Sequence, residues 1–184
     1  MLAPPAFADS AGPGTAAVKT ANDTINKLLS SKAAPAEVTK SVNDFLDIDQ
    51  LGKAAMSNSW SKLDKSQQAE FLKVLRQLIE ANYINGLKAN LSYTVTYLSE
   101  AAKPNGNIVV QTTINTHNKG RPVSLKIDYE LAKAAGKLKA FDIVTEGVSL
   151  VDNYRSMFDK IIKDKGAAAL IQKMKDKLAA TAKT

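Results

Sequence analysis

The chain has few side chains of the kinds that carry out proton transfer or nucleophilic attack. His117 is the only histidine, and there is no cysteine among the 184 residues. His117 directly precedes Asn118-Lys119-Gly120, which has the composition of a turn, so we interpret it as a solvated turn residue. No Gly-x-Ser-x-Gly element, glycine-rich phosphate loop or dinucleotide-binding motif accompanies it. The sequence therefore predicts no catalytic residue.

Two groups of carboxylates have a spacing that could do chemistry. Residues 47–49 read Asp-Ile-Asp, but the later ligands and the glycine of a calcium loop are missing, so we interpret this pair as surface charge. Paired carboxylates on neighbouring strands can act as acid and base, and four lie on two predicted strands: Asp128, Glu130, Asp142 and Glu146. Asp128 and Glu130 alternate with large apolar residues and should point outward, which favours a solubilising role. We predict no metal site.

An excess of basic residues gives the chain a net charge of +7. Lysines gather near the C-terminus, at Lys163, Lys165, Lys173, Lys175, Lys177 and Lys183. A basic amphipathic helix can touch an anionic membrane surface transiently, although an ordinary solvated helix face explains the same lysines. Arginines are few and aromatic residues make up 6%, so we expect no nucleic-acid partner.

The composition is that of one globular domain. With 45% hydrophobic and 23% charged residues, the chain can bury a core without disulfides. Ala6-Phe7-Ala8 before Asp9 fits the small-x-small pattern of a signal-peptidase site. We therefore expect residues 1–14 to be a residual signal or disordered tail, and residues 15–184 to form the domain. A simple Pro/Ala-rich tail is the alternative.

Helices are expected first along the chain. Apolar residues spaced three to four apart mark a helix over 15–31, a second opened by Pro35 and a short third from Ile48. Asp64, with Gln67 three residues later, should cap a long fourth helix, and Asn85-Gly86 should end it.

After Gly86 the hydrophobic period changes from near 3.6 to two. Leu91, Tyr93, Val95 and Tyr97 alternate with small polar residues, and further strands are expected over 108–114, 123–131 and 138–145. Tight turns between them are predicted at Pro104-Asn105-Gly106, Asn118-Lys119-Gly120 and Ala135-Gly136.

These elements predict an α+β fold. Its four strands form an antiparallel sheet with one apolar face, which the N-terminal helices and two further helices, after Ser149 and after Gly166, should cover.

Three segments carry a resemblance to a known family. Glu146-Gly147-Val148-Ser149 is followed by Tyr154-Arg155 and Phe158. Two further segments fit the same family. One contains Trp60, Ser66-Gln67-Gln68 and Phe71 and leads to Tyr83; the other is Gly120-Arg121-Pro122, which enters a strand. In combination they resemble the MlaC family, also called the toluene-tolerance family of periplasmic phospholipid-binding proteins, over about residues 15–180.

The resemblance implies a curved, NTF2-like sheet with added helices. It also implies a periplasmic component of an ABC-type lipid transport system, shuttling phospholipid between an inner-membrane ABC transporter complex and an outer-membrane lipoprotein complex. Phospholipid would be the cargo, with its acyl chains between sheet and helices, and no cofactor is expected. A sibling branch of the family is associated with hopanoids.

The predicted pocket wall combines apolar residues of the long helix, the sheet and the following helix. It consists of Leu75, Leu78, Ile79, Tyr83, Tyr93, Val95, Tyr97, Val110, Leu125, Ile127, Tyr129, Val151, Tyr154 and Phe158. Periodicity locates a buried face without showing whether the space behind it is filled. A solid-cored protein-interaction module with the same fold is therefore the first alternative. An enzyme with His117 or a carboxylate of raised pKa inside the pocket is the second.

Overall fold

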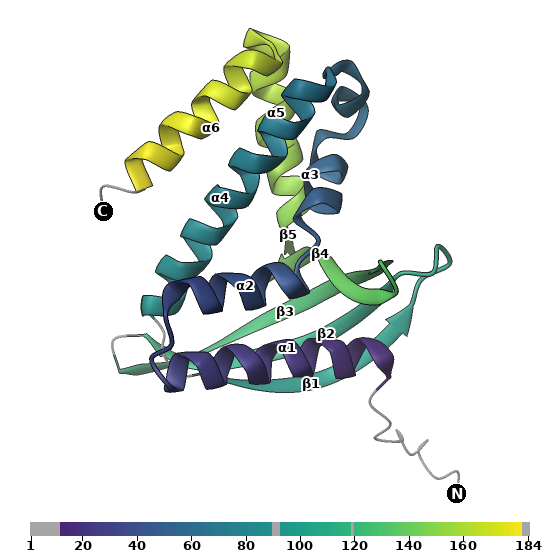
Figure 1. Ribbon diagram of the computed structural model, residues 1–184. Coiled ribbons are helices and arrows are strands. Elements are labelled where there is room, and N and C mark those ends of the chain that lie inside the picture. Colours follow the sequence, from purple (N-terminus) through teal and green to yellow (C-terminus); the bar gives the residue numbers. More distant parts are fainter. Residues whose placement is uncertain (1–11, 90–92, 119, 182–184) are drawn as a thin grey trace, which may run out of the picture.

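The computed structural model describes residues 12–89, 93–118 and 120–181, with side chains described except over 83–89 and at residue 118. Four α-helices and a 3-10 turn come first (Figure 1): α1 Pro13–Ser30, α2 Pro35–Phe45, α3 Ile48–Met56, η1 Ser57–Lys62 and α4 Lys65–Ala89. Residues 1–11 of the predicted tail and Leu91 of the first predicted strand lie outside the described residues.

The strands form one antiparallel sheet in the order β1-β2-β3-β4-β5. Their bounds are β1 Tyr93–Ala102, β2 Ile108–Asn118, β3 Arg121–Ala134, β4 Lys137–Thr145 and β5 Val148–Ser149, followed by α5 Leu150–Lys165 and α6 Ala167–Thr181. The predicted α+β class and antiparallel meander are confirmed. The sheet has a fifth strand that was not predicted, because two residues are too few to show a period of two.

Turn chemistry explains most of the element boundaries. Gly106, Gly120 and Gly136 all adopt φ values between 79° and 83°, as the predicted hairpin turns require. The predicted end of the long helix at Asn85-Gly86 is wrong, because α4 continues to Ala89. A glycine inside a helix costs only about 1 kcal/mol relative to alanine, so it weakens a helix without ending it.

Two β-bulges bend the sheet. Leu98 is an extra residue on β1, between the pairs of Tyr97 and Ser99, and Phe141 is an extra residue on β4. Bulges increase the local twist and bend the strand that carries them. Figure 1 shows α1 and α2 lying across one face of this curved sheet, while α3, α4, α5 and α6 form a bundle that stands away from it.

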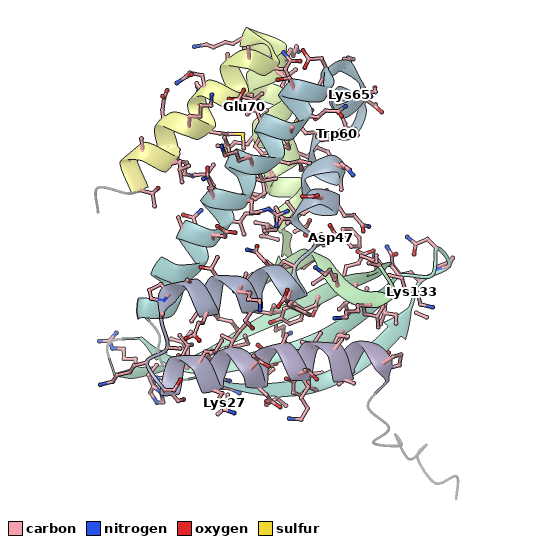
Figure 2. The ribbon with its side chains drawn as sticks, in the orientation of Figure 1. Lys27, Asp47, Trp60, Lys65, Glu70 and Lys133 are labelled. Carbon is pink, nitrogen blue, oxygen red and sulfur yellow. The ribbon has the colours of Figure 1, made fainter. Side chains whose placement is uncertain are left out.

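The helix bundle has a densely packed core around Phe71, which is fully buried. The Phe71 ring meets the ring of Phe158 edge-on, with centroids 5.4 Å apart, and that of Trp60 at 6.2 Å. Figure 2 shows Trp60 among the helices of the bundle, away from the sheet. A Cβ on Gly52 would lie 2.9 Å from Leu75 Cδ2, so glycine lets α3 approach α4 closely.

The residues of the strongest family resemblance form a corner between β4 and α5. Glu146 and Gly147 have φ values of 50° and 81° and turn the chain out of the sheet. The Ser149 hydroxyl then accepts the backbone N–H of Asp152 at 3.0 Å, which caps α5.

Asp142 and Arg155 tie this corner to the rest of the fold. The buried Asp142 carboxylate accepts the Ser149 hydroxyl at 2.6 Å and the backbone N–H of Val151 at 3.0 Å. The Arg155 guanidinium donates to the backbone carbonyl of Ala54 on α3 at 3.0 Å and also pairs with an exposed aspartate on its own helix. These residues therefore have structural roles.

We expect Ser149→Ala to destabilise the protein by about 1–2 kcal/mol, because it removes the cap of α5 and leaves one partner of buried Asp142 missing. Urea unfolding followed by circular dichroism measures the change. Ser156→Ala, an exposed position on the same helix, is the matched control and should stay within about 0.5 kcal/mol of wild type. Equal effects of the two substitutions would contradict the role of the corner.

Candidate functional site

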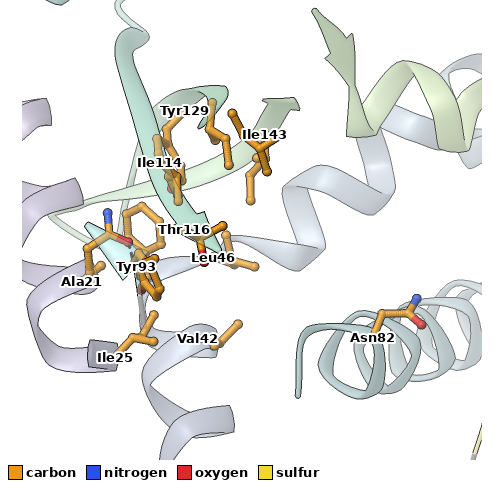
Figure 3. A pocket seen from close by; sticks show the side chains of 14 residues that line it. Ala21, Ile25, Val42, Leu46, Asn82, Tyr93, Ile114, Thr116, Tyr129 and Ile143 are labelled. Atoms are coloured by element: carbon orange, nitrogen blue, oxygen red, sulfur yellow. Dashed lines mark hydrogen bonds between the residues drawn. The ribbon is translucent and has the colours of Figure 1, made fainter. Parts of the chain in front are cut away.

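A cavity of about 380 Å³ lies between the sheet and the helices that cross it (Figure 3). Its walls come from α1, α2, one position of α4, and strands β1 to β4: Ala21, Asn22, Ile25, Val42, Phe45, Leu46, Asn82, Tyr93, Ile114, Thr116, Leu125, Ile127, Tyr129 and Ile143. Most of these side chains are hydrocarbon, and the volume lies in the usual range for small-molecule pockets. The site can therefore hold an apolar ligand.

Four residues of the predicted wall line this cavity, namely Tyr93, Leu125, Ile127 and Tyr129. Val95 and Tyr97 are half-buried side chains of the same sheet face. Four others are buried in the packed core and are not among the cavity's lining residues: Leu75, Ile79, Val110 and Val151. The side chain of Tyr83 lies outside the described residues.

The remaining predicted residues, Leu78, Tyr154 and Phe158, line a second hollow of about 500 Å³ between α4, α5 and α6. Its other apolar walls are Met157, Ile161, Leu170 and Met174, and its rim carries Lys160, Lys165, Lys173, Lys177, Asp164 and Asp176. Asn82 lines both hollows, so they adjoin at α4.

The sequence-based prediction took the helical part of the wall from α4 and α5 and missed the contribution of α1 and α2. Ile25, Val42 and Phe45 lie on apolar helix faces that were recognised, but periodicity does not say which helix covers which part of a sheet. Asn22 had a usable signal. It occurs between Val18 and Ile25 on the same face of α1, and a polar residue inside an apolar stripe invites a search for its partner.

A polar cluster stands out in the apolar wall. The Tyr93 hydroxyl donates to Asn22 Oδ1 at 3.5 Å. Burial raises the pKa of Tyr129 to about 12 and raises those of Tyr93 and Tyr97, and the Asn22 amide partly opposes the shift in Tyr97 and Tyr129. All three hydroxyls are therefore protonated at neutral pH.

Catalytic chemistry finds no support in this cavity. Among the described residues that line it, there is no histidine, lysine, arginine or carboxylate. His117 is exposed and is not among the cavity's lining residues; it lines a more open hollow near the end of β2, which shares Tyr93 and Thr116 with the cavity. Within residues 12–89, 93–118 and 120–181, no cluster of three or more histidine, cysteine or acidic residues could hold a metal ion.

The carboxylates considered from the sequence have structural partners. Asp47, at the junction of α2 and α3 (Figure 2), caps α3 by accepting the N–H of Gln50 at 2.9 Å. Asp49 pairs with Arg76 at 2.7 Å, and Glu130 on the outer sheet face pairs with a lysine. None of them faces the cavity.

Glu100 of β1 anchors the start of α1 to the sheet. Its carboxylate accepts the backbone N–H of Thr15 at 2.7 Å, the Thr15 hydroxyl at 2.8 Å and the backbone N–H of Gly14 at 3.2 Å. Burial opposes ionisation, but these three bonds outweigh it together and hold the pKa of Glu100 below its ordinary value. A Cβ on Gly14 would lie 2.6 Å from Ile108 Cγ2, so glycine allows this close approach.

We expect Glu100→Gln to lower stability at neutral pH and to have less effect in acid. In the folded protein the pKa of Glu100 lies below its ordinary value of 4.5. The ionised carboxylate therefore contributes fully to the free energy of unfolding above about pH 4.5, and this contribution is lost as the pH falls through the folded-state pKa. Urea unfolding at about pH 7 and about pH 3 measures the difference from wild type. Asp159→Asn, an exposed position on α5, is the control. An unchanged difference in acid would contradict the anchoring role.

The chain matches a protein-family model and a known protein in sequence, and a solved structure in fold. A protein-family model described as MlaC protein matches residues 16–176. The intermembrane phospholipid transport system binding protein MlaC of Haemophilus influenzae is 22% identical over 131 residues, which cover 71% of this chain and 61% of that protein. The chain thus matches less than two thirds of this relative's length.

A solved structure shares the fold over nearly the whole chain. It is the phospholipid-binding protein from Ralstonia solanacearum in complex with a phospholipid, and it superposes with a TM-score of 0.77 at 25% identity. The alignment covers 91% of this chain and 97% of that one. In the described part of the present chain, no helix has the length and apolarity needed to cross a membrane.

Proposed function

The chain belongs to the MlaC family, and on that basis we propose that it is a periplasmic phospholipid carrier that encloses acyl chains between its sheet and helices α1 and α2. In this role it exchanges lipid with an inner-membrane ABC transporter complex and an outer-membrane lipoprotein complex. The observation that carries the proposal is the largely apolar cavity of about 380 Å³, which lies in a fold shared with a protein solved with phospholipid.

The energetics of lipid transfer require such a cavity. Exposing a methylene to water costs about 0.8 kcal/mol, so a lipid with about thirty of them faces roughly 24 kcal/mol without a cover. Tyr93, Leu125, Ile127 and Tyr129 supply apolar wall from the sheet. The second hollow adjoins the cavity at Asn82 and extends the apolar surface available to the tails.

The two alternatives have less support. A solid-cored interaction module would have no space between the sheet and its covering helices, whereas the cavity occupies that space. The enzyme alternative places His117 or a carboxylate of raised pKa inside the pocket, and neither is among the cavity's described lining residues.

The N-terminal segment and the charge fit the same proposal. The Ala6-Phe7-Ala8 pattern before Asp9 fits a secretion signal in the segment that precedes α1, and we take the lipid-binding domain to begin with that helix, at Pro13 rather than at residue 15. The net charge of +7 favours transient contact with anionic membrane surfaces, where lipid would be loaded and delivered.

Native mass spectrometry of the protein, purified under mild conditions, tests the carrier function directly. We expect a complex with phospholipid, and we expect delipidated protein to take up phospholipid from vesicles. A lipid-free protein that also fails to extract phospholipid from vesicles would refute the proposal.

Leu125→Trp should fill the cavity and reduce phospholipid loading severalfold while the fold persists, because Leu125 faces the empty space. Leu98→Trp places the same ring at a position that is 57% exposed, and should load normally. Loading is measured by mass spectrometry and folding by circular dichroism. Full loading of Leu125→Trp would exclude this cavity as the lipid site.

A further inference from the structure

Asn22 is a buried polar residue that the fold itself does not satisfy. It lies in the middle of α1, lines the cavity and is only 7% exposed. Its Nδ2 has no hydrogen-bond partner in the part of the chain that the structure describes. Buried amide groups nearly always have partners, because a group removed from water without one is costly. An unpaired donor on a cavity wall therefore points to a ligand atom.

The tyrosines around Asn22 do not remove the need for such a partner. The nearby amide acts to lower the pKa of Tyr97 and Tyr129 against the effect of burial, but neither hydroxyl makes a hydrogen bond of acceptable distance and angle with Nδ2. The Tyr93 hydroxyl already takes the amide oxygen as its acceptor. Figure 3 shows Tyr93 beside Ala21 and Ile25 of α1, on the wall of the same cavity. The cluster is part of the cavity surface.

The charge of the cavity limits what the ligand atom can be. No lysine, arginine or histidine is among its described lining residues. An ionised phosphate in this position would be desolvated without a counter-charge, which is highly unfavourable. The group that meets Asn22 is therefore a neutral hydrogen-bond acceptor on an otherwise apolar ligand. In a phospholipid, the neutral acceptors attached directly to the acyl chains are the ester carbonyl oxygens.

We propose that Asn22 donates a hydrogen bond from Nδ2 to an ester carbonyl of the bound lipid, so that the cavity selects ester-linked over ether-linked chains. This selectivity rests on the carrier function proposed above and adds a specific contact to it. The Tyr93 hydroxyl makes a long contact of 3.5 Å with the amide oxygen, which leaves the nitrogen as the group available to the lipid.

The test is a competition between two phosphatidylglycerols with equal chain lengths, one diacyl and one dialkyl ether, in mixed vesicles. The ether lipid lacks the carbonyl oxygen but keeps the headgroup and the hydrocarbon. Delipidated protein is incubated with the vesicles, and native mass spectrometry measures the ratio of the two loaded forms. Wild type should prefer the diacyl lipid by roughly fivefold to tenfold, the range expected for one net hydrogen bond.

Asn22→Leu should bring this ratio to about one, because the donor is lost while the ether lipid still binds. Asn22→Ala, which adds no bulk, should also bring the ratio of diacyl to ether lipid to about one. It replaces the leucine variant in the test if that variant does not fold. Ile25→Val is the matched control on the same wall. It removes one methylene, should weaken loading of both lipids alike and should leave the ratio at the wild-type value.

The outcomes separate the two proposals. Loading of both lipids by wild type without preference, or a preference that survives in the Asn22 variants, would overturn the assignment of Asn22 while leaving the carrier function intact. If wild type loads neither lipid, the carrier function fails and the Asn22 contact fails with it.

Discussion

An apolar sheet face must be shielded from water, and in this protein the straight helices α1 and α2 that cross the sheet do not match its curvature. The sheet is bent by bulges at Leu98 and Phe141, whereas the helices that cross it are stiff rods held by their own hydrogen bonds. Helix α1 is tied to the sheet at Gly14 and Thr15 by Glu100. Two turns further on, it lines open space at Asn22 and Ile25. The cavity is thus a product of shape mismatch between two regular elements.

The tightest packing and the cavity beneath α1 and α2 lie in different parts of the chain. The bundle of α3 to α6 contains a tightly packed core with Phe71 at its centre. The sheet with α1 and α2 encloses unfilled volume, which lowers stability because its walls lose packing contacts. The corner around Asp142 and Ser149 joins the two parts. The packed core around Phe71 thereby allows the space beneath α1 and α2 to remain unfilled.

Local patterns in the sequence predicted most of the helices, strands and turns. The alternation of Tyr93, Val95 and Tyr97 and the turn glycines depend on neighbours in the chain, so they could be read directly. The two-residue β5 and the continuation of α4 past Gly86 could not, because tertiary pairing and packing decide them.

The site was harder to predict than the fold for a physical reason. Leu75 and Leu125 both belong to recognised apolar faces, yet Leu75 is packed in the core and Leu125 faces the cavity. A buried face produces a periodic pattern of apolar residues in the sequence. The distance between the sheet and the helices that cover it produces no such pattern. The part of the site with a sequence signal is Asn22, a polar residue where the helix face should be apolar.

The bulge at Leu98 also affects how separate copies of the chain behave toward one another. Strand β1 is an outer strand of the sheet and could in principle recruit a strand from a second molecule. The extra residue breaks the regular row of backbone donors and acceptors along that strand and increases its twist. This geometry disfavours edge-to-edge pairing of separate copies of the chain through β1.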